Sequence, residues 1–206
     1  MGQEPNEPRG WHSRRYLPHI DAGSQPQFIT WRLDDSLSPH LIDQWKAVLK
    51  HLPEKDQKRE LYRKIETHLD EGHGSQILKN PAAAKIVQDC LVHGHHTKYT
   101  LHHWVVMPTH VHVILTPLND RTLESILKPL KSFSALQINR VLGREGQLWQ
   151  YESFDRLIRD FEHFQNTACY IEWNPVKAKL CLDPSKWPYS SANPVAFERL
   201  KEKESG

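Results

Sequence analysis

The sequence predicts an α+β domain in which an antiparallel sheet is covered by helices mainly on one face. Three observations carry this prediction. Residues 27–33, QFITWRL, alternate polar and apolar side chains, which is typical of a half-buried strand. Residues 98–107 and 110–116 are two β-rich runs joined through Pro108 and Thr109, as in a tight antiparallel hairpin. Amphipathic stretches lie around these strands without a strict alternation of strand and helix, which favours an antiparallel sheet over a parallel one.

Three stretches between the first strand and the hairpin have helical spacing of their apolar residues. Residues 38–52 begin with a Ser38 cap followed by a proline, and residues 80–94 begin in the same way at Asn80. Residues 54–72 carry an apolar stripe among charges and end at Gly72. We expect an amphipathic helix in each stretch.

Two further helices are predicted after the hairpin, one with a proline inside it and one with a proline just after it. Residues 122–143 are expected to kink or divide at Pro129. The helix of residues 160–174 begins at an Asp160 cap and is expected to end near Asn174, because Pro175 disfavours helix before it. Residues 147–158 between them are interpreted as extended chain, and the segment after Pro175 as a loop-rich tail.

Composition indicates a cytoplasmic globular protein. The 206 residues predict an arm over 1–25, rich in proline and charge, one domain over 26–192 and a tail over 193–206. The net charge of +2 does not by itself indicate a nucleic-acid binder. Three cysteines without CxxC spacing indicate neither a disulfide framework nor a cysteine zinc site. No stretch has the apolar length of a signal peptide or a membrane span, so no membrane contact is expected.

A pair of histidines in the second hairpin strand is the first candidate site. In MPTHVHVIL, residues 107–115, His110 and His112 are two apart, so their side chains share one strand face about 6.6 Å apart. Two imidazoles placed in this way could bind one divalent ion. The other interpretation is that both histidines lie on a solvated sheet face.

A tyrosine and an asparagine form the second candidate. In ACYIEWNP, Tyr170 and Asn174 are four residues apart and therefore share one face of the predicted helix. A phenol and an amide on this face could approach the same ion. Taken singly, Tyr170 could be a core tyrosine and Asn174 a helix stop before proline.

Three motifs in this order carry a resemblance to a known family: WVVMPTHVHVILTP, LWQYESFDRLIRD and YIEWNPVKAKL. Together they resemble the single-tyrosine HUH transposases, and specifically the REP-associated tyrosine transposases, over roughly residues 26–192. Such proteins often have asparagine where Thr109 stands here, beside the histidine pair.

The resemblance implies a fold, a site and a reaction. It implies a ferredoxin-like antiparallel sheet with the pair His110 and His112 on a central strand and the nucleophile Tyr170 on a helix beside it. Asn174 would be the third metal ligand. A divalent ion, Mg²⁺ or Mn²⁺ with zinc still possible, would polarise a phosphate of single-stranded or hairpin DNA. Tyr170 would attack it and form a 5′-phosphotyrosine, which permits strand transfer without ATP.

Basic and aromatic residues are candidates for holding the DNA, by phosphate contacts and base stacking. The basic candidates are Arg14, Arg15, Lys128, Lys131, Arg140, Arg144, Arg156 and Arg159, and the aromatic ones are Trp11, Trp149 and Trp173. A rival metal site is offered by a histidine cluster without a recognised ligand spacing, comprising His93, His95, His96, His102 and His103.

Two other function classes remain open at this point. One is a nucleic-acid-binding module without catalysis on the same scaffold. The other is a histidine-rich metallohydrolase that uses water as nucleophile and forms no protein–DNA adduct. The oligomeric state is expected to be a monomer or a homodimer.

Overall fold

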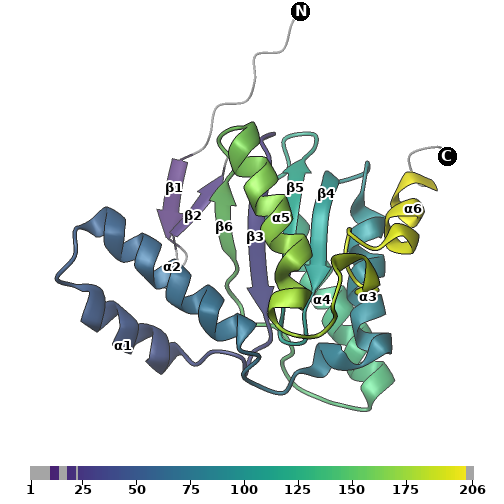
Figure 1. The fold of residues 1–206 in the computed structure, drawn as a ribbon, viewed down its shortest axis with the longest axis horizontal. Helices are drawn as coiled ribbons and strands as arrows, with labels where there is room; N and C mark the ends of the chain where they lie inside the picture. Colours follow the sequence, from purple (N-terminus) through teal and green to yellow (C-terminus); the bar gives the residue numbers. More distant parts are fainter. Residues whose placement is uncertain (1–9, 14–17, 22, 203–206) are drawn as a thin grey trace, which may run out of the picture.

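A four-stranded antiparallel sheet forms the centre of the computed structural model, which describes residues 10–13, 18–21 and 23–202 (Figure 1). Its strands are β3 (Gln27–Arg32), β4 (Tyr99–Val106), β5 (His110–Pro117) and β6 (Phe154–Leu157). The order across the sheet is β4-β5-β3-β6, and each neighbouring pair is antiparallel. The predicted hairpin is therefore confirmed as β4 and β5.

The connections give the sheet a ferredoxin-like topology. Helices lie between β3 and β4 and between β5 and β6, so the chain follows the order strand, helix, strand, strand, helix, strand. The first and third of these strands, β3 and β5, are the two central ones. The α+β class and the central position of the histidine-bearing strand are as predicted.

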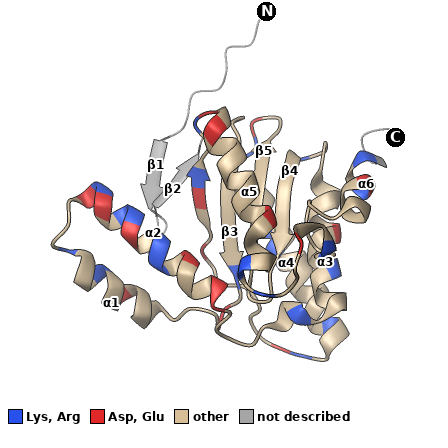
Figure 2. Cartoon of the chain, viewed as in Figure 1, with Lys and Arg blue, Asp and Glu red and all other residues tan. Residues whose placement is uncertain are grey.

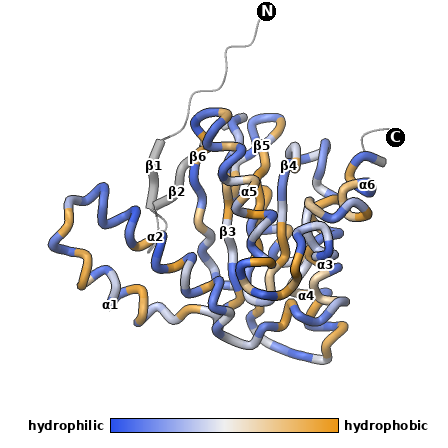
Figure 3. Tube along the Cα trace, in the orientation of Figure 1, coloured by the Kyte–Doolittle hydropathy of each residue, from blue (hydrophilic) through white to orange (hydrophobic). Residues whose placement is uncertain are grey.

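Helices cover the two faces of the sheet unequally. α3 (Pro81–Gly94), α4 (Leu123–Leu142) and α6 (Pro194–Glu202) share a core with Ile29 and Trp31 of β3. α5 (Phe161–Lys177) packs through Ile171 on the other face, against Phe28. Because Phe28 and Ile29 are consecutive strand residues, they point to opposite faces. Figure 1 shows α5 in front of the sheet, and Figure 3 shows hydrophobic residues along the central strands.

A helical pair extends from one side of the sheet. α1 (Pro39–Leu49) and α2 (Glu54–Asp70) pack on each other, and Ile65 and Leu69 of α2 reach Phe154 of β6. Figure 2 shows charged residues distributed along α2, whose apolar stripe faces inward. The short turns η1 (Ile77–Lys79) and η2 (Pro184–Lys186) lie before α3 and after α5. α2 ends close to the sheet, next to the last turns of α5.

The expected division of a helix at Pro129 and the expected helix end near Asn174 were both wrong. α4 is a single helix that contains Pro129, and α5 continues past Pro175 to Lys177. A proline removes one backbone hydrogen bond, but buried neighbours such as Leu130 and Ile171 hold each helix against the core. Packing therefore overrides the local preference, with the consequence that Asn174 lies inside a helix and not at its end.

The two ends of the chain also differ from expectation. β1 (Gly10–Ser13) and β2 (Pro18–Asp21) pair as an antiparallel hairpin in the segment interpreted as an arm without regular structure. The segment interpreted as a loop-rich tail contains α6, whose Ala196 and Leu200 are buried in the main core. In the part of the chain that the structure describes, no helix is both long and apolar enough to span a bilayer.

Candidate active site

The histidine pair is buried on the face of the sheet that α5 covers. His110 and His112 are both 0% exposed, so the interpretation of a solvated sheet face was wrong. In the β3–β5 register His112 lies opposite Thr30, and the Nδ1 atom of His112 is 2.7 Å from the Thr30 hydroxyl. The His112 ring also stacks on Phe28, with 5.4 Å between ring centroids. These contacts fix the orientation of the ring.

Thr109 orients the other imidazole. Its hydroxyl donates to the carbonyl of Leu69, at 3.4 Å, and lies 3.0 Å from Nδ1 of His110. A hydroxyl whose hydrogen is already donated accepts a hydrogen bond, so Nδ1 of His110 carries the proton and Nε2 the lone pair. Polar partners on the far nitrogen are typical of metal-binding histidines. Thr109, which departs from the common family motif, is thus suited to this position.

Tyr170 and Asn174 lie on one helix, α5, on the side of the sheet that carries the histidine pair. The Tyr170 ring centroid is 5.4 Å from that of His112 and 6.1 Å from that of Phe28. Asn174 is completely buried, in the interior of α5. The interpretation of Asn174 as only a helix stop was therefore wrong.

Asp70, the last residue of α2, joins this group and was missed in the sequence. Its Oδ1 atom lies 3.8 Å from Nε2 of His110 and accepts a hydrogen bond of 3.2 Å from the Asn174 side chain. Ligand atoms of Asp70, His110 and His112 all lie within 4.8 Å of one another. In the sequence Asp70 is one of several carboxylates in residues 54–72, and no local signal distinguished it from the others.

The polar atoms at the centre of this group lack hydrogen-bond partners among the described residues. They are Nε2 of His110, Nε2 of His112, Oδ1 of Asn174 and the Tyr170 hydroxyl, and all are buried. Buried polar atoms are normally paired, and each unpaired one costs about 1–3 kcal/mol. Two imidazole nitrogens, one amide oxygen and the nearby Asp70 carboxylate are suitable ligands for a divalent cation. The residues present therefore fit a metal ion.

Burial sets the protonation of the site. It lowers the pKa of His110 to about 3 and holds the pKa of His112 well below its ordinary value, with smaller effects of His110 and Lys177 on the latter. Both imidazoles are therefore neutral at physiological pH, as metal ligation requires. Burial also raises the pKa of Asp70 to about 6, against the opposing hydrogen bond from Asn174.

A layer of charged side chains surrounds the Tyr170 phenol. The ammonium of Lys177 lies 4.7 Å from the centre of the Tyr170 ring. The Arg156 guanidinium lies 5.5 Å from the Phe28 ring and 5.4 Å from the Tyr62 ring. Burial, followed by the charges of Glu66 and Asp70, raises the pKa of Tyr170 above its ordinary value. The phenol is therefore protonated until something assists its ionisation.

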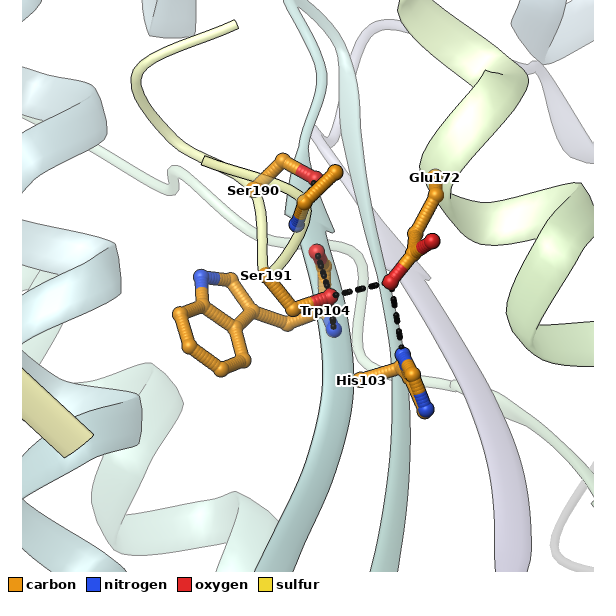
Figure 4. Close-up of polar contacts among 6 residues, drawn as sticks. His103, Trp104, Glu172, Ser190 and Ser191 are labelled. Carbon is orange, nitrogen blue, oxygen red and sulfur yellow. Dashed lines mark hydrogen bonds and ion pairs between the residues drawn. The ribbon is translucent and has the colours of Figure 1, made fainter. Parts of the chain in front are cut away.

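Glu172 anchors the helix that carries Tyr170 (Figure 4). Its Oε1 atom accepts hydrogen bonds from Nδ1 of His103 at 2.9 Å and from the Ser191 hydroxyl at 3.4 Å. The Ser191 hydroxyl also accepts from the backbone N–H of Trp104, at 3.2 Å. Since the carboxylate lies between serine and histidine, the histidine does not activate the serine as it would in a catalytic triad. We interpret this network as fixing α5 on β4.

The predicted DNA contacts are dispersed, and of those that the structure describes only Arg156 reaches the site. Lys128, Lys131 and Arg140 belong to α4, on the opposite face of the sheet. Lys131 donates to backbone carbonyls of Gln150 and Tyr151, and Arg144 donates to Asn139. Arg159 is exposed. Arg14 and Arg15 lie outside the described residues, as does the side chain of Trp11.

The two other tryptophans differ from each other. Trp149 is only 5% exposed, donates to Ser134 and packs edge-on against Trp31, so its interpretation as a stacking platform was wrong. Trp173 is 47% exposed and remains a candidate platform.

The rival histidine cluster has no common centre. The His95 and His96 rings contact each other, with centroids 3.8 Å apart, but His102 contacts Thr116 and His103 contacts Glu172. These histidines form no close ligand group among the described residues. In the described part of the chain, a second close group comprises His68, Glu71 and His73 at the end of α2. The rings of its two histidines stack at 4.3 Å, an orientation in which their in-plane lone pairs do not converge on one ion.

Comparison with known proteins identifies relatives of one kind. No protein-family model matches the chain. It is 32% identical over 96 residues to a putative REP-associated tyrosine transposase of Haemophilus influenzae, covering 42% of this chain and 54% of that protein. It is 30% identical over 94 residues to the REP-associated tyrosine transposase of Escherichia coli, covering 45% of this chain and 54% of that protein. The chain thus spans about half the length of the curated relatives that it matches.

Solved structures give weaker matches. One is the REP-associated tyrosine transposase bound to a REP hairpin, 22% identical, with a TM-score of 0.47 over 87% of this chain and 81% of that one. Another is a putative transposase of Deinococcus radiodurans, 16% identical, with a TM-score of 0.31 over 72% of this chain and 89% of that one. The curated proteins to which this chain is similar, at about 30% identity, are REP-associated tyrosine transposases.

Proposed function

We propose that this protein is a REP-associated tyrosine transposase that nicks single-stranded DNA beside a hairpin and transfers the strand through a 5′-phosphotyrosine. One observation supports the proposal: the Tyr170 ring lies 5.4 Å from that of His112, and the buried Nε2 atoms of His112 and of its neighbour His110 lack partners among the described residues. A nucleophile beside an incomplete ligand set is what metal-assisted phosphoryl transfer requires. The names of the relatives and the hairpin in one of the solved complexes indicate the substrate class.

His110, His112, Asn174 and Asp70 would hold the divalent ion, Mg²⁺ or Mn²⁺. When bound, the ion would polarise a phosphate and offset the negative charge that develops on it. Asp70 also accepts from the Asn174 amide, which leaves Oδ1 of Asn174 free to act as a ligand. The carboxylate thereby adds the negative charge that two imidazoles and an amide lack.

The Tyr170 oxygen would form the bond to phosphorus while the bond from phosphorus to the 3′ oxygen breaks. The 3′ oxygen takes a proton from water, and the 5′ phosphate stays on Tyr170 until a second 3′-hydroxyl displaces it. Lys177, over the tyrosine ring, stabilises negative charge on the phenol oxygen. Glu172, held by His103, fixes the helix that carries the nucleophile. No external energy source is needed for rejoining.

The test is adduct formation with a labelled single-stranded DNA that contains a hairpin, in Mg²⁺ or Mn²⁺, followed by a denaturing gel. We expect a covalent protein–DNA band that is lost in Tyr170→Phe and kept in the control Tyr151→Phe, whose tyrosine is 69% exposed. Cleavage that survives Tyr170→Phe would instead indicate a metallohydrolase that uses water. Binding without cleavage under either metal would indicate a nucleic-acid-binding module.

A further inference from the structure

Arg32, the last residue of β3, is a buried cation on the sheet face that carries the histidine pair. In the β3–β5 register it lies directly opposite His110, and directly opposed residues of an antiparallel pair share one face. Arg32 is only 3% exposed. A guanidinium stays charged at physiological pH, and removing it from water without a partner costs free energy. A buried arginine therefore requires an anionic partner.

The protein does not supply this partner completely. The Nε and Nη1 atoms of Arg32 are buried and have no hydrogen-bond partner among the described residues. The carboxylates of Glu152 and Asp34 act on the guanidinium, but neither accepts a hydrogen bond from these two atoms. Asp34 instead accepts from the side chain of Gln147, at 2.7 Å. Burial outweighs both carboxylates and lowers the pKa of Arg32 to about 10, so the group remains a cation with unused donors.

Lys131 brings a second positive charge to the same end of the sheet. The N–H of Gln150 donates to the Arg32 carbonyl, and the Lys131 ammonium donates to the carbonyls of Gln150 and Tyr151. These acceptors are neutral, so they do not compensate the charge of the ammonium. Burial, followed by the charge of Arg32, lowers the pKa of Lys131 to about 8, against the opposing charge of Glu152. Positive charge is thus in excess at this end of β3.

Phe154 fixes the position of the guanidinium relative to the histidine pair. The guanidinium carbon of Arg32 lies 5.6 Å from the centre of the Phe154 ring. Phe154 of β6 and His112 of β5 both lie opposite Thr30, on either side of β3. They are therefore two strand spacings apart, roughly 10 Å. One phosphate group does not span this distance, so an anion bound at Arg32 differs from one beside the candidate metal ligands.

We propose that Arg32 binds a backbone phosphate of the DNA next to the phosphate that enters the metal site, an assignment that rests on the proposed function. Guanidinium N–H groups are suited to phosphate oxygens, and the charge of Lys131 strengthens the attraction. Solvent reaches this end of the site, since the side chain of Asp70, 3.8 Å from His110, is 27% exposed. Arg32 is thus a positioning residue: by holding the neighbouring phosphate it places the scissile one.

The affinity for single-stranded DNA that contains a hairpin, measured by fluorescence anisotropy at several salt concentrations, tests this contact. EDTA prevents metal-assisted cleavage during the measurement. Arg32→Met should raise the dissociation constant on the order of 10-fold. It should also reduce the slope of log affinity against log salt concentration by about 0.7, the value for one phosphate of a single strand. Arg32→Lys should keep the slope with a smaller loss of affinity, and the control Arg199→Met, at an exposed position of α6, should change both little.

Inorganic phosphate tests the anion site without DNA. In urea unfolding at constant ionic strength, replacing chloride by phosphate should raise the midpoint of the wild type and of Arg199→Met more than that of Arg32→Met. In chloride, Arg32→Met should be at least as stable as the wild type, because the methionine replaces a buried charge whose donors lack partners.

The outcomes separate the anion site from the proposed function. An unchanged salt slope in Arg32→Met would overturn the DNA assignment, even where phosphate stabilises the protein through Arg32. Equal phosphate effects on all three proteins would overturn the anion site itself, and so would a marked loss of stability of Arg32→Met in chloride, which would show that the guanidinium is paired within the protein. Absence of DNA binding by the wild type would instead refute the proposed function, and the DNA assignment with it.

Discussion

Replacing Glu66 by glutamine should stabilise the folded protein, increasingly so as the pH rises. Burial raises the pKa of the Glu66 carboxyl to about 7 in the folded protein, against an ordinary value of 4.5. Folding therefore favours the protonated form, whose contribution to stability is complete below pH 4.5 and is lost as the pH rises through 7. Glutamine has a similar shape and remains neutral throughout, so it avoids this loss.

The size of the effect follows from the shift. One pKa unit corresponds to about 1.4 kcal/mol, so the full shift corresponds to roughly 3 kcal/mol. Between pH 5 and pH 8 the free energy of unfolding of Glu66→Gln should gain roughly 2–3 kcal/mol relative to that of the wild type. For a chain of this size the gain corresponds to about 5–10 °C in melting temperature.

Urea unfolding of both proteins in EDTA, at pH 5, 6, 7 and 8, measures this difference. EDTA removes any contribution of bound metal. The control Glu54→Gln, on the solvent-exposed face of α2, should show a nearly constant difference from the wild type. A difference between Glu66→Gln and the wild type that does not change with pH would show that the carboxyl is not buried in the way described, and the reasoning would fail.

Three further changes test the site and the core. Tyr170→Phe should leave the free energy of unfolding within about 0.5 kcal/mol of the wild type, because the hydroxyl has no hydrogen-bond partner among the described residues. A large loss of stability in urea unfolding would show that the hydroxyl makes a stabilising hydrogen bond. In calorimetry, Mn²⁺ at 100 times its dissociation constant should stabilise the folded wild type by about 2.7 kcal/mol. It should have little effect on the stability of His112→Ala. Equal stabilisation of both proteins would mean that the ion binds elsewhere. Gly94→Ala should lower the free energy of unfolding by about 1–3 kcal/mol or more, because a Cβ there would overlap the Tyr99 ring. Adding Tyr99→Phe to this variant should not restore the lost stability fully, since the ring carbons also clash with that Cβ.

Periodicity in the sequence was sufficient to predict the parts of the site that lie within single elements. Alternation along a strand placed His110 and His112 on one face, and helical spacing placed Tyr170 with Asn174. Asp70 was missed because its place in the site depends on how the end of α2 meets α5, a contact between residues about a hundred positions apart. Local rules describe neighbours along the chain and contain no information on such packing.

The errors have the same physical origin. Pro129 and Pro175 were expected to interrupt helices, and buried contacts hold both helices together. Trp149 was considered as a platform for DNA bases, yet the sheet and α4 enclose it. The helix within the predicted tail, α6, is held by Ala196 and Leu200 in the core. In each case tertiary burial outweighs a local preference.

The hydrogen bond from the Thr109 hydroxyl to the Leu69 carbonyl connects α2 to the histidine pair on the sheet, while Asp70 connects the same helix to Asn174 of α5. The last turn of α2 contacts the His110 imidazole through Thr109 and the Asn174 amide through Asp70. A displacement of this helix would therefore reorient an imidazole on the sheet and an amide on α5 at the same time. Any molecule that shifts the α1–α2 pair would thereby change the geometry of metal binding without contacting the nucleophile.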